Sequence, residues 1–177
     1  MAEILFNKVR DVKSPSKSYD YAAATDFYVP NYNSTFTADL VAKNPNKYDY
    51  KIDISQKLDG MTITLMPHGR INIPSGIRVV ISDPRTCLLA VNKSGISTKK
   101  GIVLSACLVD ADYRGEIHLG IINSSNEPVQ IKSGDKLVQF MYLPVLNPNF
   151  TEIDSVKFES FPNTARGSCG FGSSDNT

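Results

Sequence analysis

The sequence predicts an all-β protein, with its strands arranged as a sandwich, a jelly roll or a barrel. Short runs rich in β-branched and aromatic residues recur along the chain, and several alternate apolar with polar residues. Turn-forming Gly, Pro, Asn and Ser residues separate these runs. No window shows a long 3.6-residue apolar period with helix caps at both ends. Short strands with turns between them are typical of layered or closed β folds.

The clearest strands are expected from residue 61 onward. In chain order, the strand-like runs are MTITLM (61–66), IRVVIS (77–82), EIHLGIIN (116–123), PVQI (128–131) and KLVQFMYL (136–143). Turn sequences separate them, such as Pro-His-Gly at 67–69 and Ser-Gly-Asp at 133–135. Residues 31–60 are more polar, and we expect them to form a surface insertion that could hold one extra hairpin around KYDYKIDI.

Length and composition indicate one ordinary globular domain. The 177 residues are 41% apolar and 21% charged, enough for a full hydrophobic core. The formal net charge of +1 gives no overall attraction to nucleic acid or to an acidic membrane surface. We therefore expect neither as a partner.

Cysteine usage and the N-terminus favour a soluble, cytoplasmic protein. Cys87, Cys107 and Cys169 are odd in number and widely spaced, which argues against zinc and against a secreted disulfide framework. The segment MAEILFNKVRDVK does not resemble a signal peptide, and no run approaches the length of a membrane span. A nuclear or viral origin stays open.

The stretch CLVDADYRGEIHLGIIN (107–123) is the most informative for chemistry. It places Asp110, Asp112 and Tyr113 directly before an apolar strand. A buried carboxylate at a hairpin mouth is costly unless it binds a water, a cation or a hydrogen-bond donor. A solvated turn, in which each aspartate bonds its own backbone, is the equally supported alternative on this stretch alone.

Three further stretches carry weaker signals. In NKSGISTKKGIVL, a lysine, a serine and a glycine at 93–95 suit a phosphate, although basic turns are usually only solvated. In SGDKLVQF, Gln139 is polar within an apolar strand, which an outward-facing position would also explain. In AAATDFYVP, Asp26 lies between small and aromatic residues.

The tail ARGSCGFGSSDNT (165–177) is rich in glycine and serine, as frayed ends are. Arg166 and Phe171 are two residues that a frayed end does not need.

The order of these stretches carries a resemblance to a known family. ATDFYVP, NKSGIS, VDADYRGE, SGDKLVQF and ARGSCGFGSS occur in the order of the five motifs of the homotrimeric dUTP pyrophosphatase (dUTPase) family. MPHGRINIPSGIRVVI is similar to the strand–turn–strand before the second motif, and only residues 31 to about 60 lie outside the resemblance. It implies a distorted jelly-roll β-barrel that forms a homotrimer. Residues 1–164 would form the single domain, and 165–177 a flexible arm that closes over the active site.

By this resemblance the chain would hydrolyse dUTP to dUMP and pyrophosphate, keeping uracil out of DNA and supplying dUMP for dTMP synthesis. Asp110 would orient the water that attacks the α-phosphorus in a site shared among three subunits. Tyr113 would stack under the deoxyribose and exclude a 2′-hydroxyl. Uracil would be read by the main chain of the hairpin near Cys107 and His118, the latter with no catalytic role.

The resemblance also implies which residues hold the triphosphate. Lys93, Ser94, the Gly95 amide and Gln139 would bind phosphates. Magnesium would be chelated by the triphosphate, with Asp26 holding it through water, since Mg²⁺ usually keeps several waters.

In the arm, Arg166 and Ser173 would clamp the outer phosphates. Phe171, followed by Gly172, would lie across the uracil ring.

The chain departs from the family pattern at several positions, and alternatives remain. Lys93 stands where arginine is usual, which loosens phosphate orientation because lysine lacks a bidentate fork. Cys107 stands in a hairpin that is commonly glycine-rich, and Cys169 replaces a glycine of the arm. A dCTP deaminase-type enzyme shares the fold. A regulatory or docking protein that contacts a partner through residues 31–60, and a purely structural jelly roll, are the non-enzymatic alternatives.

Overall fold

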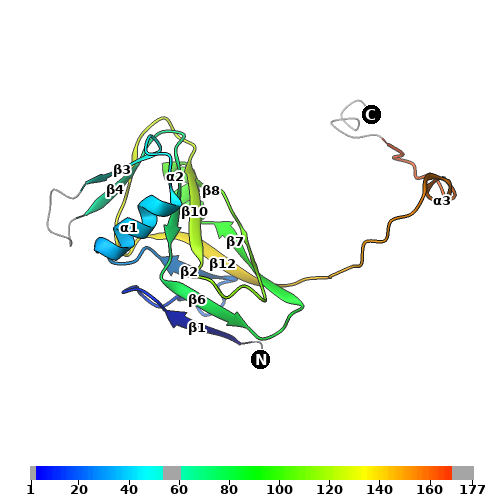
Figure 1. Ribbon diagram of the computed structural model, residues 1–177, viewed down its shortest axis with the longest axis horizontal. Coiled ribbons are helices and arrows are strands. Elements are labelled where there is room, and N and C mark those ends of the chain that lie inside the picture. The colour runs from blue at the N-terminus through cyan, green and yellow to red at the C-terminus, as the bar shows by residue number, and fades with distance from the viewer. Residues whose placement is uncertain (1–2, 54–60, 169–177) are drawn as a thin grey trace. The chain divides into compact units, whose positions relative to one another are not determined.

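The computed structural model describes residues 3–53 and 61–168 of the chain (Figure 1). It divides into two units between Leu146 and Asn147. All twelve strands of the described part belong to the first unit. The prediction of an all-β protein is confirmed.

The elements of the first unit follow one another with short connections. In chain order they are β1 (Ile4–Lys8), β2 (Ala24–Tyr28), α1 (Ser34–Lys43), β3 (Tyr50–Asp53), β4 (Thr62–Leu65), β5 (Arg70–Pro74), β6 (Ile77–Ile81), β7 (Thr86–Asn92), α2 (Ser94–Lys100), β8 (Ile102–Leu104), β9 (Leu108–Asp110), β10 (His118–Asn123), β11 (Val129–Ile131) and β12 (Lys136–Pro144).

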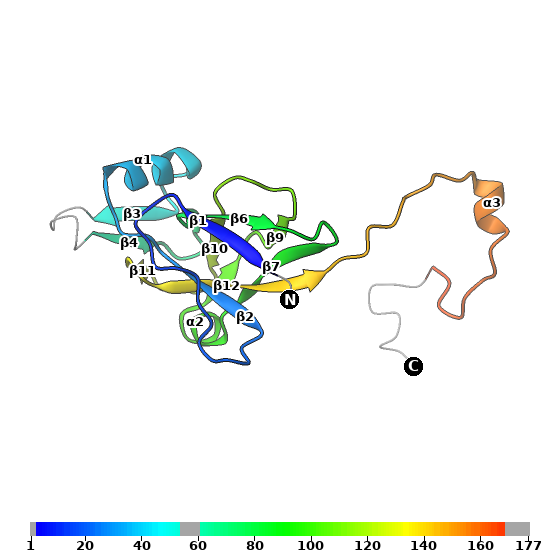
Figure 2. The same cartoon turned by 90° about the horizontal axis from the view of Figure 1, so that it is seen from below.

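The strands form four small antiparallel sheets. Their strand orders are β1-β6, β5-β10-β8, β11-β4-β3 and β2-β12-β7-β9. Most neighbours are far apart in the chain, as in a jelly roll, where strands return to pair with distant ones. Figure 2 shows α1 and α2 on opposite sides of the layered strands.

The five expected strands are all present, as β4, β6, β10, β11 and β12. β6 alternates, with Ile77, Val79 and Ile81 buried and the residues between them exposed. β10 begins two residues later than the apolar pattern suggested. The reason is that Ile117 bonds elsewhere: its amide donates to the carbonyl of Ile77 at 2.9 Å, and its carbonyl accepts from Ser75 at 3.0 Å.

The central strand β7 did not stand out in the sequence. It pairs with β12 along its whole length and with β9 on its other edge. Its residues TCLLAVN are buried at four of the first five positions, so the run does not alternate. A short continuous apolar run is consistent with a buried strand, but by periodicity alone it cannot be told from a buried helix.

The expectation that residues 31–60 form a surface insertion needs correction. Residues 34–43 form helix α1, and its Phe36 and Leu40 are completely buried in the main core. Asn33 caps the helix by accepting a hydrogen bond from the amide of Phe36 at 2.8 Å. Only two of its ten residues are buried, and they lie one turn apart, so the apolar pattern of the helix extends over a single turn. The caps Asn33 and Asn44 were the available signal.

The expected hairpin around KYDYKIDI is present in part. β3 pairs with β4, with Tyr50 opposite Leu65. Tyr50 is buried and donates its hydroxyl hydrogen bond to the carbonyl of Asn44 at 3.0 Å. The segment thus contributes aromatic side chains to the core as well as surface. Residues 54–60, the remainder of this segment, lie outside the described part.

The second unit is described by itself. Within its described residues it has one helix, α3 (Ser155–Glu159), whose N-cap Asp154 accepts from the amide of Lys157 at 2.7 Å. The division of the chain into a domain of residues 1–164 and an arm of 165–177 stays a prediction. In the described residues, no helix is long and apolar enough to cross a membrane.

Candidate functional site

A cavity of about 210 Å³ opens between strands of two different sheets. It brings together four residues that the sequence singled out: Cys107, Asp110, Tyr113 and His118. The rest of its lining is largely apolar and consists of Asn72, Ala90, Ala106, Leu108, Val109, Ile117, Gly120, Val138 and Phe140. Ala106, Leu108, Val109 and Ile117 belong to the hairpin, residues 104–109 and 116–119, that the family resemblance assigned to uracil. The other five had no predicted role, and they come from strands distant in the chain.

Asp110 is the last residue of β9, at the mouth of this cavity. β9 lies beside β7, and Asp110 is opposite Cys87. A turn follows at once, closed by the amide of Tyr113, which donates to the carbonyl of Asp110 at 3.1 Å. The carboxylate is exposed. The turn therefore holds an accessible carboxylate and an aromatic ring at one rim.

The Tyr113 ring is folded back over its own turn. Its hydroxyl donates a hydrogen bond to the carbonyl of Glu116 at 2.9 Å. A Cβ at Gly115 would lie only 2.3 Å from the hydroxyl oxygen of Tyr113 and 2.5 Å from its Cζ. Glycine is needed here because any side chain would displace the ring. His118 Nδ1 lies 2.9 Å from the same carbonyl, which requires the ring proton on Nδ1.

A second group of expected site residues lies at the far end of β7. Lys93 follows β7 and occupies the N-cap position of α2, which begins with Ser94 and Gly95. A Cβ at Gly95 would meet no atom within 4 Å, so the backbone there is open. Gln139 of β12 donates to the carbonyl of Asn92 at 3.0 Å, which holds its side-chain amide at the end of β7. The structure thus places the candidate phosphate-binding residues together.

Asp26 in β2 belongs to this second group. Its side chain is 3% exposed, and it pairs with Lys93 and, at 3.0 Å, with Lys136. Ser18 donates a further hydrogen bond at 2.9 Å. Burial disfavours the charged carboxylate, but the hydrogen bonds from the two lysines and Ser18 outweigh it and lower the pKa of Asp26. Lys136 and Ser18 were missed, although Lys136 stands within the quoted SGDKLVQF.

These contacts decide how well Asp26 suits a magnesium ion. The described residues contain no cluster of three side chains that could hold a metal. Three donors already occupy the Asp26 oxygens. A carboxylate has about four lone-pair sites, so these three donors leave one of them. The residues fit an ion that arrives with a triphosphate and keeps its waters.

The pairing of Asp26 has a testable consequence for stability. A carboxylate whose pKa is lowered by folding stabilises the protein above its unfolded pKa, and that stabilisation is lost as the pH falls through the folded pKa. We expect Asp26→Asn to lower the free energy of unfolding at pH 7 by about 1–3 kcal/mol. Urea unfolding of both chains should show this difference shrinking as the pH approaches about 3. A difference that is constant with pH would contradict the assignment.

The two groups are far apart within one chain. Asp110 is opposite Cys87, and Lys93 is six residues further along the extended strand β7. At about 3.3 Å per residue, the two ends are separated by about 20 Å.

The predicted arm residues belong to the second unit, Asn147–Thr177. Arg166 is described and lies in a turn of the second unit. Phe171, Gly172 and Ser173 lie outside the described residues, as does Cys169.

Comparison with known proteins connects this arrangement to one family. A dUTPase family model matches residues 52–175. A relative from Glaesserella parasuis serovar 5, named deoxyuridine 5′-triphosphate nucleotidohydrolase, is 32% identical over 160 residues, covering 89% of this chain and 94% of the relative. A relative of the same name from Haemophilus ducreyi is also 32% identical, covering 89% of this chain and 93% of the relative.

Solved structures share the fold. A variant dUTPase of Staphylococcus bacteriophage 80alpha with dUpNHpp superposes with a TM-score of 0.68 at 18% identity, covering 97% of this chain and 98% of the other. A variant dUTPase from phage phi11 of S. aureus, in which a structural Mg(II) ion is coordinated, has a TM-score of 0.63 at 17% identity, covering 86% and 97%. The jelly-roll prediction agrees with these folds, and from its family match and its relatives the chain belongs to the dUTPase family.

Proposed function

We propose that the chain hydrolyses dUTP to dUMP and pyrophosphate, with Asp110 as the general base. The observation that carries this proposal is the turn that holds Asp110 and Tyr113 at the mouth of a largely apolar cavity. Such a cavity suits a base and a sugar, and an exposed carboxylate at its rim suits a water that attacks the adjoining phosphate. The curated relatives named for this activity support it.

In the proposed reaction the Asp110 carboxylate accepts a proton from a water molecule. The water oxygen forms a bond to the α-phosphorus, and the bond from that phosphorus to the bridging oxygen breaks, releasing pyrophosphate. The chain contributes positioning and charge: Lys93, Ser94 and Gln139 hold the phosphates. Mg²⁺, when bound to the triphosphate, supplies further neutralisation of negative charge.

The separation along β7 supports an active site built from more than one copy of the chain. A single nucleotide cannot contact Asp110 and the Lys93 group of one protomer when about 20 Å separates their strand positions. A second copy would bring its own Lys93 group to the Asp110 cavity of the first. A third would supply the arm with Arg166 and Phe171. Light scattering should therefore give a mass of three chains.

One assay tests the activity. Pyrophosphate release is measured from dUTP, dCTP, dTTP and UTP, with magnesium and with a chelator, and ammonia release is measured from dCTP. We expect rapid release from dUTP alone, strongly reduced by the chelator. Ammonia from dCTP would support a deaminase of the same fold, and no release from dUTP would overturn the proposal.

A further inference from the structure

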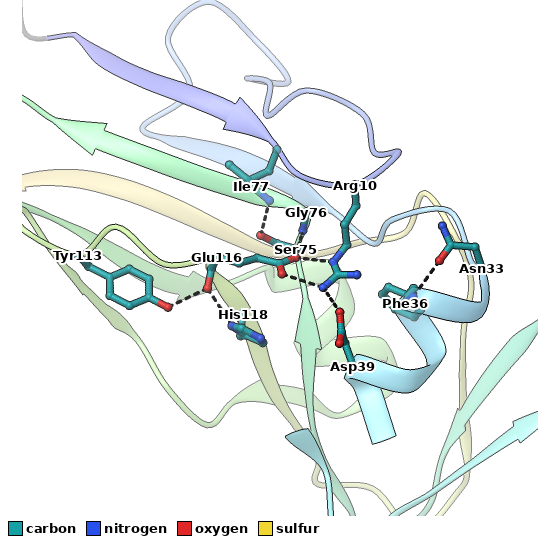
Figure 3. A network of polar contacts seen from close by, with 10 residues as sticks. All are labelled: Arg10, Asn33, Phe36, Asp39, Ser75, Gly76, Ile77, Tyr113, Glu116 and His118. Atoms are coloured by element: carbon teal, nitrogen blue, oxygen red, sulfur yellow. Dashed lines mark hydrogen bonds and ion pairs between the residues drawn. The ribbon is translucent and has the colours of Figure 1, made fainter. Parts of the chain in front are cut away.

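Arg10 lies between helix α1 and the loop that carries Tyr113 (Figure 3). It follows β1 and is 12% exposed. Its guanidinium contacts one carboxylate on each side, Asp39 of α1 and Glu116 just before β10. These three residues are distant in the chain, so nothing in the sequence linked them.

The contact with Glu116 has the geometry of a fork. Arg10 Nε donates to Glu116 Oε1 at 2.7 Å, and its Nη2 donates to Oε2 at 2.9 Å. Glu116 Oε1 also accepts from the amide of Gly76 at 2.7 Å. Two parallel charge-assisted hydrogen bonds fix the orientation of both groups, which a lysine cannot reproduce. The Glu116 side chain, 15% exposed, is thereby held at both oxygens.

The backbone around Gly76 leaves room for this contact. Gly76 has a φ of 74°, and a Cβ there would lie 2.9 Å from Val12 Cγ1 and 3.0 Å from the Arg10 Cβ. A side chain at this position would push Arg10 away from Glu116. The amide of Val9, the residue before Arg10, donates to the Gly76 carbonyl at 2.8 Å. The glycine at position 76 and this backbone hydrogen bond thus hold Arg10 beside Glu116.

On its other side, Arg10 is tied to α1 by two contacts. Nη2 donates to Asp39 Oδ2 at 2.6 Å. The guanidinium carbon lies 6.0 Å from the centre of the Phe36 ring, within the range of a cation–π contact. Because Phe36 is completely buried, the contact between Arg10 and α1 is anchored in the core.

We propose that Arg10 is a positioning residue for sugar discrimination: through Glu116 it fixes the carbonyl that receives the Tyr113 hydroxyl. The Glu116 carbonyl accepts from Tyr113 at 2.9 Å and lies 2.9 Å from His118 Nδ1, so two cavity-lining side chains depend on one main-chain oxygen. A shift of Glu116 moves the Tyr113 ring relative to the cavity. This inference rests on the proposed function, in which that ring excludes a 2′-hydroxyl.

The test compares Arg10→Lys with the wild-type trimer. The variant keeps the charge and loses the fork. We expect the ratio of kcat/KM for dUTP to that for UTP to fall by about 10- to 100-fold, as expected for a small misplacement of a group that contacts substrate. The ratio of dUMP to UMP affinity, measured by calorimetry, should fall in the same direction.

A double-mutant cycle separates positioning from general destabilisation. Tyr113→Phe removes the hydroxyl that bonds the Glu116 carbonyl, so it should lower the same ratio. The double variant Arg10→Lys/Tyr113→Phe should lose no more selectivity than the larger single change, because both act through one contact. Fully additive losses, or an unchanged ratio in Arg10→Lys, would overturn the inference.

Two further variants keep the test decisive. Arg85→Lys breaks a similar fork to Asp83 on the surface, where Arg85 is 81% exposed, and should leave the ratio unchanged. If Arg10→Lys does not fold, Asp39→Asn serves, because Asp39 is 46% exposed and the fork to Glu116 remains. Because the guanidinium loses one of its two carboxylate contacts, we expect Asp39→Asn to lower the ratio by about two- to fivefold; no change there would equally overturn the inference.

The same measurements distinguish this inference from the proposed function. Absence of pyrophosphate release by the wild-type chain would refute the function while the dUMP and UMP affinities still report on Arg10. Normal release with an unaltered Arg10→Lys ratio would refute the Arg10 role alone.

Discussion

Asp110→Asn should lower pyrophosphate release from dUTP by about 10²–10⁴-fold, the usual contribution of a general base. An amide of the same shape cannot accept the proton of the attacking water. The turn itself should persist, since the amide of Tyr113 donates to the main-chain carbonyl of residue 110. Binding of a non-hydrolysable dUTP analogue, measured by calorimetry, should therefore change little. Stopped-flow detection of pyrophosphate gives the rate.

Asp112→Asn is the matched control for this change. Asp112 lies in the same turn and is exposed, but it does not line the cavity. We expect turnover close to that of the wild type. Equal losses in the two variants would indicate a general effect of charge on the turn, and undiminished turnover in Asp110→Asn would refute the assignment of the base.

Phe36→Ala should lower the free energy of unfolding by about 3–5 kcal/mol, the cost of removing a large aromatic side chain from a core. The Phe36 ring is completely buried, contacts Tyr32 with the ring centres 5.1 Å apart, and lies under the Arg10 guanidinium. Its loss leaves a cavity between α1 and the strands. Urea unfolding at one fixed chain concentration measures the effect, because the stability of the proposed trimer depends on concentration.

Val41→Ala is the matched control, because it shortens an exposed apolar side chain on the same helix. Val41 is 39% exposed on the outer side of α1 and should cost no more than about 0.5 kcal/mol. If Phe36→Ala cost as little as Val41→Ala, residues 34–43 would be the surface insertion that the sequence suggested. A regulatory partner for residues 31–60 stays a prediction that neither change tests.

The β-rich part of the fold was predictable because its signals are local. β6 alternates buried and exposed residues, and β12 is a long run of mostly apolar residues, so each was visible within its own segment. β7 was missed because a central strand has no polar face, and α1 because only Phe36 and Leu40 mark its buried side. Whether the residues of such a short pattern are buried depends on the elements that pack over them.

The candidate site was predictable to the extent that its residues stand in motifs. Asp110, Tyr113, Lys93 and Gln139 were found from quoted stretches, and the structure places them in two groups at opposite ends of β7. Their distance was not predictable, because it depends on which strands pair. The contacts of Asp26 with Lys136 and Ser18 were missed for the same reason.

The order of short motifs along the chain was enough to determine the family. Which residue types stand in each motif, and in which order, can be read directly from the sequence. Only the tertiary structure decided that Arg10, Asp39 and Glu116 form one bridge, or that Phe36 is core. Such contacts join residues separated by up to 106 positions. They follow from how strands and a helix pack in space, which no local pattern encodes.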